Sequence, residues 1–146
     1  MKFEKFFKSV GTHGLIVKES NGTPWLVCAG VGMRIPEGVN NLGVSVDPTP
    51  VFSAIVSSEP DGDFLGLKDA ILPTPDGKAK DIIRVFETLL GDRVGICNAD
   101  FGLLEKSDRL TYLEVEDDET MVTAKFAVVR DHADEVIGYI NGVDVQ

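Results

Sequence analysis

The chain has 146 residues, of which 24 are acidic and 14 are basic, so its formal net charge is −10. A surface this acidic repels nucleic-acid phosphates and anionic membranes, which argues against direct nucleic-acid binding. The hydrophobic content of 43% is ordinary for a globular protein, and no apolar run approaches the ~18 residues of a membrane-spanning helix. We therefore expect one soluble α+β domain over residues 1–146, located in the cytoplasm or in a particle assembled there.

The two cysteines, Cys28 and Cys97, both lie in apolar stretches with strand character. A disulfide framework needs more cysteines than two. A zinc site would have to bring both of them together with the only histidines, His13 and His132, from four distant parts of the chain. We therefore expect reduced, buried thiols, and neither a metal nor another cofactor.

The first elements in chain order are a short amphipathic helix and a hairpin. Phe3, Phe6 and Phe7 recur at helical spacing, with lysines between them. Residues 15–19 and 25–29 are typical strands, and the Asn-Gly pair at 21–22 between them is the strongest short hairpin signal. The stretch Gly30–Gly43 is rich in Gly, Pro and Asn, which predicts a long irregular loop.

The middle of the chain is expected to contain two strands and one long helix. Residues 44–46 and 51–57 have strand character, and 64–72 are of mixed character, with a short helical turn as one interpretation. Thr74 and Pro75 are typical of a helix start, and Gly91 of a helix end. Between them, apolar residues recur every three or four positions: Ala79, Ile82, Ile83, Phe86, Leu89 and Leu90. We therefore predict a long amphipathic helix over about residues 75–90.

The last part of the chain is predicted to be mostly strands joined by short turns. Strands are expected over 93–99, 109–115, 121–130 and 135–140, and the final Val143-Asp144-Val145 is expected to return as an edge strand. The total is about seven to nine strands. Because short turns favour antiparallel pairing, we predict an α+β fold in which these strands pack on the long helix.

Three short motifs resemble functional signatures but lack the context that each one needs. Gly30-Val31-Gly32 follows a strand but does not open a helix, as a phosphate-binding loop would. Asp61-Gly62-Asp63 lacks the regular ligand series of a calcium loop. Asp100-Phe101-Gly102 matches a kinase tripeptide in a chain without the other kinase signatures. We interpret the first as turn glycines, the second as a solvated loop and the third as a chance match.

The leading hypothesis is a non-catalytic structural or interaction protein that associates with itself or with another protein of a larger assembly. It depends on the missing catalytic motifs, the turn-rich strands and the edge strand at the end of the chain. A viral particle component or accessory fits this description. The expected contact segments are the N-terminal helix, the Gly30–Gly43 loop and the final strand, with these candidate interaction residues: Phe3, Phe6, Phe7, Met33 and Arg34.

Two alternatives from other classes stay open. A small-molecule binder or Cys-dependent enzyme would have its site near Cys97, Asn98 and Asp100, with His13 or His132 as the partner of the thiol. An acidic decoy of nucleic acid would need the carboxylates of Glu59–Asp63 and Glu114–Glu119 to lie on one face.

Overall fold

The computed structural model describes residues 1–39, 43–59, 64–71, 82–117 and 121–145. Within these ranges the helices are α1 (Phe3–Val10), α2 (Pro50–Val56) and α3 (Asn98–Phe101). The strands are β1 (Leu15–Lys18), β2 (Pro24–Cys28), β3 (Val31–Arg34), β4 (Val44–Val46), β5 (Gly66–Ile71), β6 (Ile83–Glu87), β7 (Arg93–Cys97), β8 (Arg109–Asp117), β9 (Val122–Arg130) and β10 (Val136–Asn141).

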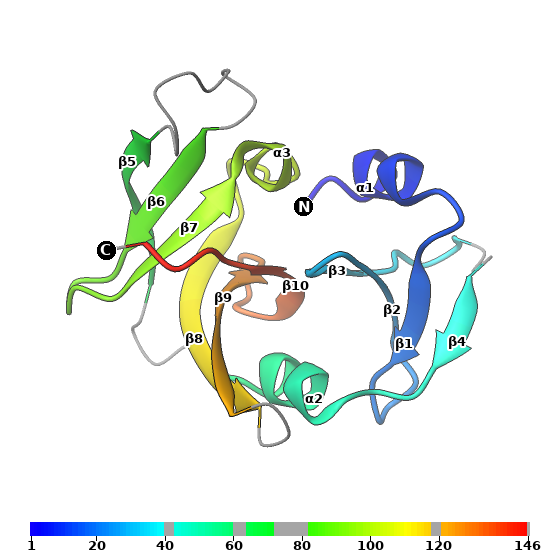
Figure 1. Cartoon of the computed structure of the whole chain (residues 1–146). Helices are drawn as coiled ribbons and strands as arrows, with labels where there is room; N and C mark the ends of the chain where they lie inside the picture. The colour runs from blue at the N-terminus through cyan, green and yellow to red at the C-terminus, as the bar shows by residue number, and fades with distance from the viewer. Residues whose placement is uncertain (40–42, 60–63, 72–81, 118–120, 146) are drawn as a thin grey trace.

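The strands form two sheets. The larger sheet has seven strands in the order β4-β1-β2-β3-β10-β9-β8, and the smaller one has three in the order β5-β6-β7. The β1–β4 pair is parallel, and the other strand pairs are antiparallel. In Figure 1 the large sheet curves from β1 round to β8, α2 closes the open side, and the small sheet lies outside β8.

Away from the exposed edge strand β4, both faces of the large sheet are buried, because side chains alternate between two hydrophobic clusters along its central strands. The inner cluster gathers round α2 and includes Trp25, Phe52, Ile55, Phe126 and Tyr139. The outer cluster packs the other face against α1 and the small sheet, and it includes Phe6, Val10, Leu26, Ile96 and Val129. This arrangement explains why β9 ends in an unbroken buried run, from 126 to 130.

Several predicted elements are confirmed. The N-terminal helix is α1, and the hairpin round residues 21–22 pairs Leu15 with Val27 and Lys18 with Pro24. The strands predicted over 93–99, 109–115, 121–130 and 135–140 correspond to β7, β8, β9 and β10. The final segment makes one antiparallel bridge, between Val143 and Gly95, and is not a full strand. That residues 1–146 form one domain stays a prediction.

The predicted α+β fold with its long helix over 75–90 is wrong, since the chain is mainly β. Residues 72–81 lie outside the described residues, but 83–87 form strand β6 and 88–92 form a turn. Strand β6 pairs with both β5 and β7, with Ile83 opposite Cys97 and Phe86 opposite Val94. The apolar repeat of this segment suits a strand buried on both faces as well as it suits a helix, and the pairing decides between them.

Three other segments also differ from the prediction. The segment predicted as a strand over 51–57 is α2, because Thr49 Oγ1 accepts a hydrogen bond from the Phe52 amide at 3.1 Å and Pro50 takes the first turn. The Gly30–Gly43 loop contains β3, which pairs Met33 with Leu26 of β2 and with Gly138 of β10. The mixed segment 64–72 contains β5 and no described helical turn.

Candidate functional site

The five candidate interaction residues lie at different depths. Phe6 and Met33 are 3% and 1% exposed and belong to the outer core, so they offer no surface to a partner. Arg34 is half-buried, and its guanidinium donates to the carbonyl of Val136 at 2.6 Å. Phe3 is half-buried and Phe7 is exposed. Of the five, Phe3 and Phe7 keep the accessible apolar surface that a contact needs.

Two of the predicted contact segments meet beside α1. Phe3 and Phe7 line a hollow of about 40 Å³ together with Ile35 and Val39 of the Gly30–Gly43 segment. A hollow of this size is far below the ~300 Å³ at which typical ligand pockets begin. The hollow therefore lies where α1 covers the sheet and does not indicate a ligand site. The interaction role of Phe3 and Phe7 stays a prediction.

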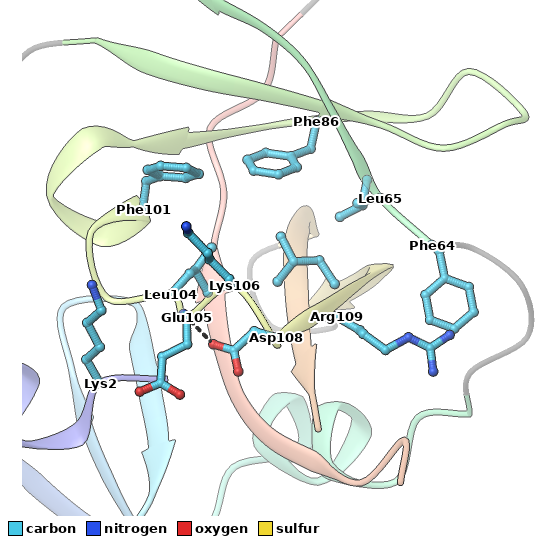
Figure 2. A pocket seen from close by; sticks show the side chains of 11 residues that line it. Lys2, Phe64, Leu65, Phe86, Phe101, Leu104, Glu105, Lys106, Asp108 and Arg109 are labelled. Atoms are coloured by element: carbon cyan, nitrogen blue, oxygen red, sulfur yellow. Dashed lines mark hydrogen bonds between the residues drawn. The ribbon is translucent and has the colours of Figure 1, made fainter. Parts of the chain in front are cut away.

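A groove of about 690 Å³ lies between the small sheet, α3 and the start of β8. Figure 2 shows Phe86 and Phe101 on one side of it and Phe64 on the other, with Leu65 between them. The rings of Phe86 and Phe101 lie 6.1 Å apart between centroids. The volume lies within the range of about 300–1,000 Å³ that is typical of ligand pockets, and the walls are apolar.

Short polar contacts hold the groove in shape. The Leu65 amide donates to the carbonyl of Leu110 at 2.9 Å, which fixes the Phe64 segment to β8. The guanidinium of Arg109 stacks over the Phe64 ring at 4.3 Å from its centroid. The carboxylate of Asp108 accepts from the Met1 amino group at 2.8 Å and from the Glu105 amide at 2.9 Å. These contacts hold the Phe64 segment against β8 and the segment before β8 against the N-terminus.

The rim of the groove is basic, although the chain as a whole is acidic. Lys2, Lys106 and Arg109 are exposed beside it, and Arg109 is paired with Asp134 at 2.6 Å. Of the two rim carboxylates, Asp108 is neutralised by the Met1 amino group, and Glu105 lies 4.0 Å from the same group. The groove therefore offers apolar walls and a positive rim, a combination that suits an apolar group with acidic neighbours.

The turn between β6 and β7 exposes two consecutive leucines. Leu89 is 101% exposed and Leu90 is 84% exposed. The turn itself is well ordered, because the Thr88 amide donates to the Asp92 carbonyl at 2.9 Å and the Asp92 amide to Thr88 Oγ1 at 3.1 Å. Gly91 has φ +95°, a conformation that favours glycine. We call residues 88–92 the leucine tip.

Ion pairs stiffen the base of the leucine tip. Glu87 accepts from Lys68 at 2.6 Å and from Arg93 at 3.2 Å, which ties β5, β6 and β7 together at this end. The hydrogen bond from Lys68 holds the pKa of Glu87 below its usual value. Sequence reasoning misses the tip, because the helical repeat predicts Leu89 and Leu90 on the buried face of a helix. The signal that could have found it is the polar pattern Thr88…Gly91-Asp92, which is typical of a turn.

A second groove, of about 510 Å³, lies between α1 and α3. Its lining includes Asn98 and Asp100, which belong to the predicted small-molecule site, together with Lys5, Ser9 and Cys28. Its walls contain neither Cys97 nor either histidine, so the structure does not bring the predicted Cys-His pair together there. Lys5 Nζ donates to the carbonyl of Gly102 at 3.2 Å.

The prediction of two buried thiols is wrong for Cys97, which is exposed, and Cys28 is half-buried. Cys97 ends β7, where the strand runs into α3, so its side chain lies outside both cores. Both thiols are free. In the residues that the structure describes, no group of three or more His, Cys, Asp or Glu side chains could hold a metal ion.

No family model, curated protein or solved structure matches this chain. What the chain does must therefore follow from its geometry and its chemistry. No helix among the described residues is long and apolar enough to cross a membrane.

Replacing Asp100 with asparagine is expected to stabilise the protein at pH 7. Burial raises the pKa of Asp100 above 3.8, so the folded protein binds this proton more tightly than the unfolded chain does. The stability that Asp100 contributes is therefore complete below the unfolded pKa and is lost as the pH rises through the folded pKa. The melting temperature of Asp100→Asn should exceed that of the wild type at pH 7, and the difference should vanish near pH 3.

Glu37→Gln is the matched control for the Asp100 experiment. Glu37 is exposed, and its substitution removes one negative charge, as Asp100→Asn does. The control should leave the melting temperature nearly unchanged at both pH values. An equal gain from the two substitutions would mean that relief of the overall charge of −10, and not local burial, is the cause.

Proposed function

We propose that this chain is a non-catalytic interaction protein that associates with itself or docks into a larger assembly. The observation that supports the proposal is the leucine tip, where Leu89 and Leu90 are fully accessible on an ordered hairpin. Single exposed apolar residues are common, but two adjacent leucines at the end of a projecting turn form a compact apolar knob.

The gain from covering this tip is large enough to matter. Burying a leucine side chain is worth about 1.5–3 kcal/mol, so two leucines supply roughly 3–6 kcal/mol towards association. Because hydrogen bonds and ion pairs already order the turn, little further conformational entropy is lost when a partner covers it. A rigid apolar knob of this kind is an effective anchor for a protein contact.

Sedimentation of the protein in a gentle lysate of its natural cells tests this proposal. We expect the wild-type chain to migrate well above its own mass of 15.8 kDa. The Leu89→Ser/Leu90→Ser variant should shift towards the monomer, because both apolar anchors are lost. Migration of the wild type as a 15.8 kDa monomer would contradict the proposal.

A second candidate function is the binding of a small molecule in the groove between α1 and α3. It is favoured by the volume of about 510 Å³ and by the half-buried Asp100, whose pKa is raised by burial. A ligand with a cationic or hydrogen-bond-donating group would suit Asp100 and Asn98. A Cys97-dependent activity has no added support, since Cys97 does not line this groove.

Two finer suggestions stay open. Nothing beyond the reasoning from sequence supports a viral particle in preference to another assembly. For the acidic decoy, Glu59 and Glu114 are exposed, but residues 60–63 and 118–119 lie outside the described residues.

A further inference from the structure

The groove and the leucine tip have complementary chemistry. The groove has apolar walls and a volume of about 690 Å³, several times the ~150 Å³ cavity that accommodates a benzene molecule. The tip is an apolar knob made of two leucine side chains. Each feature leaves apolar surface exposed to water, and both lie on the same chain. When a tip fills a groove, the apolar surface of the tip and that of the groove are both removed from water.

The tip and the rim of the groove also carry complementary charges. The tip carries one exposed carboxylate, that of Asp92, while Glu87 at its base is paired with Lys68 and Arg93. The charge of Asp92 also reaches Tyr112, whose hydroxyl donates to Glu114 at 2.7 Å. Burial raises the pKa of Tyr112 first, and then this hydrogen bond and the negative charges of Glu114, Asp92 and Asp144 raise it further. The exposed carboxylate of Asp92 therefore matches the exposed ammonium group of Lys106 at the rim of the groove.

The groove and the leucine tip lie close enough together for two copies of the chain to make the contact reciprocally. Phe86 lines the groove from β6, and Leu89 follows three residues later in the turn, so the two residues are at most about 10 Å apart along the chain. Two copies related by a two-fold axis can make this contact reciprocally when the knob and the groove are neighbours on one surface. Each copy then places its knob in the groove of the other. Such an arrangement closes at two chains.

We propose that the groove is occupied by the leucine tip of a second copy of this chain, in a reciprocal dimer. This inference rests on the proposed function and names its partner. In the dimer Leu89 and Leu90 lie between Phe64, Phe86 and Phe101 of the other copy, and Asp92 faces Lys106 there. An anionic membrane is a poorer partner for the tip, because its acidic neighbours are repelled by the lipid headgroups.

The test is the mass of the purified full chain, measured by light scattering from about 1 µM to 1 mM, a range that covers weak and strong dimers. The expected result is a concentration-dependent approach to 31.6 kDa, twice the 15.8 kDa of one chain, and no larger species. Leu89→Ser/Leu90→Ser should weaken the dimer about a hundredfold or more, since two leucines are no longer buried.

Two further variants make the test specific. Val44→Ser/Val46→Ser removes exposed apolar surface from the edge strand β4 and should leave dimerisation unchanged. Asp92→Lys and Lys106→Glu should each weaken the dimer, and the two together should restore it, because the ion pair between the copies is re-formed with its charges exchanged. Neither substitution replaces a core residue, since both side chains are exposed.

The outcomes separate this inference from the proposed function. The reciprocal contact is overturned if Leu89→Ser/Leu90→Ser does not weaken the dimer, or if Asp92→Lys and Lys106→Glu together do not restore it. Self-association itself would then still hold. A strict monomer at every concentration overturns the dimer, and the lysate experiment then decides whether another protein covers the tip. Tip-dependent binding to neutral lipid vesicles by a monomeric chain would also overturn the dimer.

Discussion

Replacing Trp25 with alanine is expected to lower the free energy of unfolding by about 3–5 kcal/mol, the usual cost of truncating a buried aromatic side chain. Trp25 is 0% exposed at the centre of the inner core. Its ring packs edge-on against Phe52 of α2, at 5.5 Å between centroids, and stacks on Tyr139 at 6.1 Å. Because α2 closes the curved sheet through these contacts, the cavity left by alanine would loosen the whole inner core.

Urea unfolding followed by far-ultraviolet circular dichroism would measure this loss. Fluorescence cannot be used for the comparison, because Trp25 is the only tryptophan of the chain. Trp25→Phe is the control: it keeps a ring in the core but loses the hydrogen bond from the indole nitrogen to Glu19, which is 2.8 Å long. We expect it to cost about 1–2 kcal/mol. A cost below about 1 kcal/mol for Trp25→Ala would contradict the observed packing of α2.

Replacing Arg130 with methionine is expected to cost about 3 kcal/mol of the free energy of unfolding. Arg130 is 2% exposed at the end of β9, and its guanidinium joins three separate segments. It donates to Thr111 Oγ1 at 3.1 Å, to the carbonyl of Asp134 at 2.9 Å and to the carbonyl of Ser58 at 2.9 Å. Methionine fills similar space but leaves these acceptors unsatisfied, at about 1–3 kcal/mol each. Methionine also avoids the free-energy cost of burying the charged guanidinium, and this offsets part of that loss.

Arg109→Met provides the matched control for Arg130. Arg109 lies opposite Arg130 in the β8–β9 pair, and its side chain bonds the carboxylate of Asp134 at 2.6 Å while it remains 45% exposed. An exposed ion pair contributes about 0–1 kcal/mol, so this substitution should change the melting temperature little. The Arg130 variant should melt on the order of 10 °C lower than the wild type, measured by calorimetry. Equal stabilities for the two variants would show that the desolvation cost of Arg130 cancels its hydrogen bonds.

The candidate site combines segments that lie far apart in sequence. Phe64 precedes β5, Phe86 lies in β6, Phe101 in α3 and Arg109 at the start of β8. No local pattern in the sequence connects these positions, because a groove is formed only when the sheets pack. The leucine tip was within reach of sequence reasoning, since its turn residues follow one another directly.

Several elements follow from local signals in the sequence. The aromatic spacing of Phe3, Phe6 and Phe7 produced α1, the Asn-Gly pair at 21–22 produced the first hairpin, and the alternating stretches produced β8 and β9. Capping at Thr49 and Pro50 was also present in the sequence, although the residues that follow were interpreted as a strand. Local signals succeed where the conformation depends on neighbours in the chain.

The conformation of residues 82–92, and with it the site, depends on pairing between distant strands. Ile83 and Phe86 fit a helix stripe and a two-faced strand equally well, and pairing with β5 and β7 selected the strand. That selection turned Gly91 from an expected helix end into part of a hairpin turn and moved Leu89 and Leu90 from an expected core into solvent. The physical reason is that strand hydrogen bonds are made with distant partners, whereas helix hydrogen bonds lie within one segment.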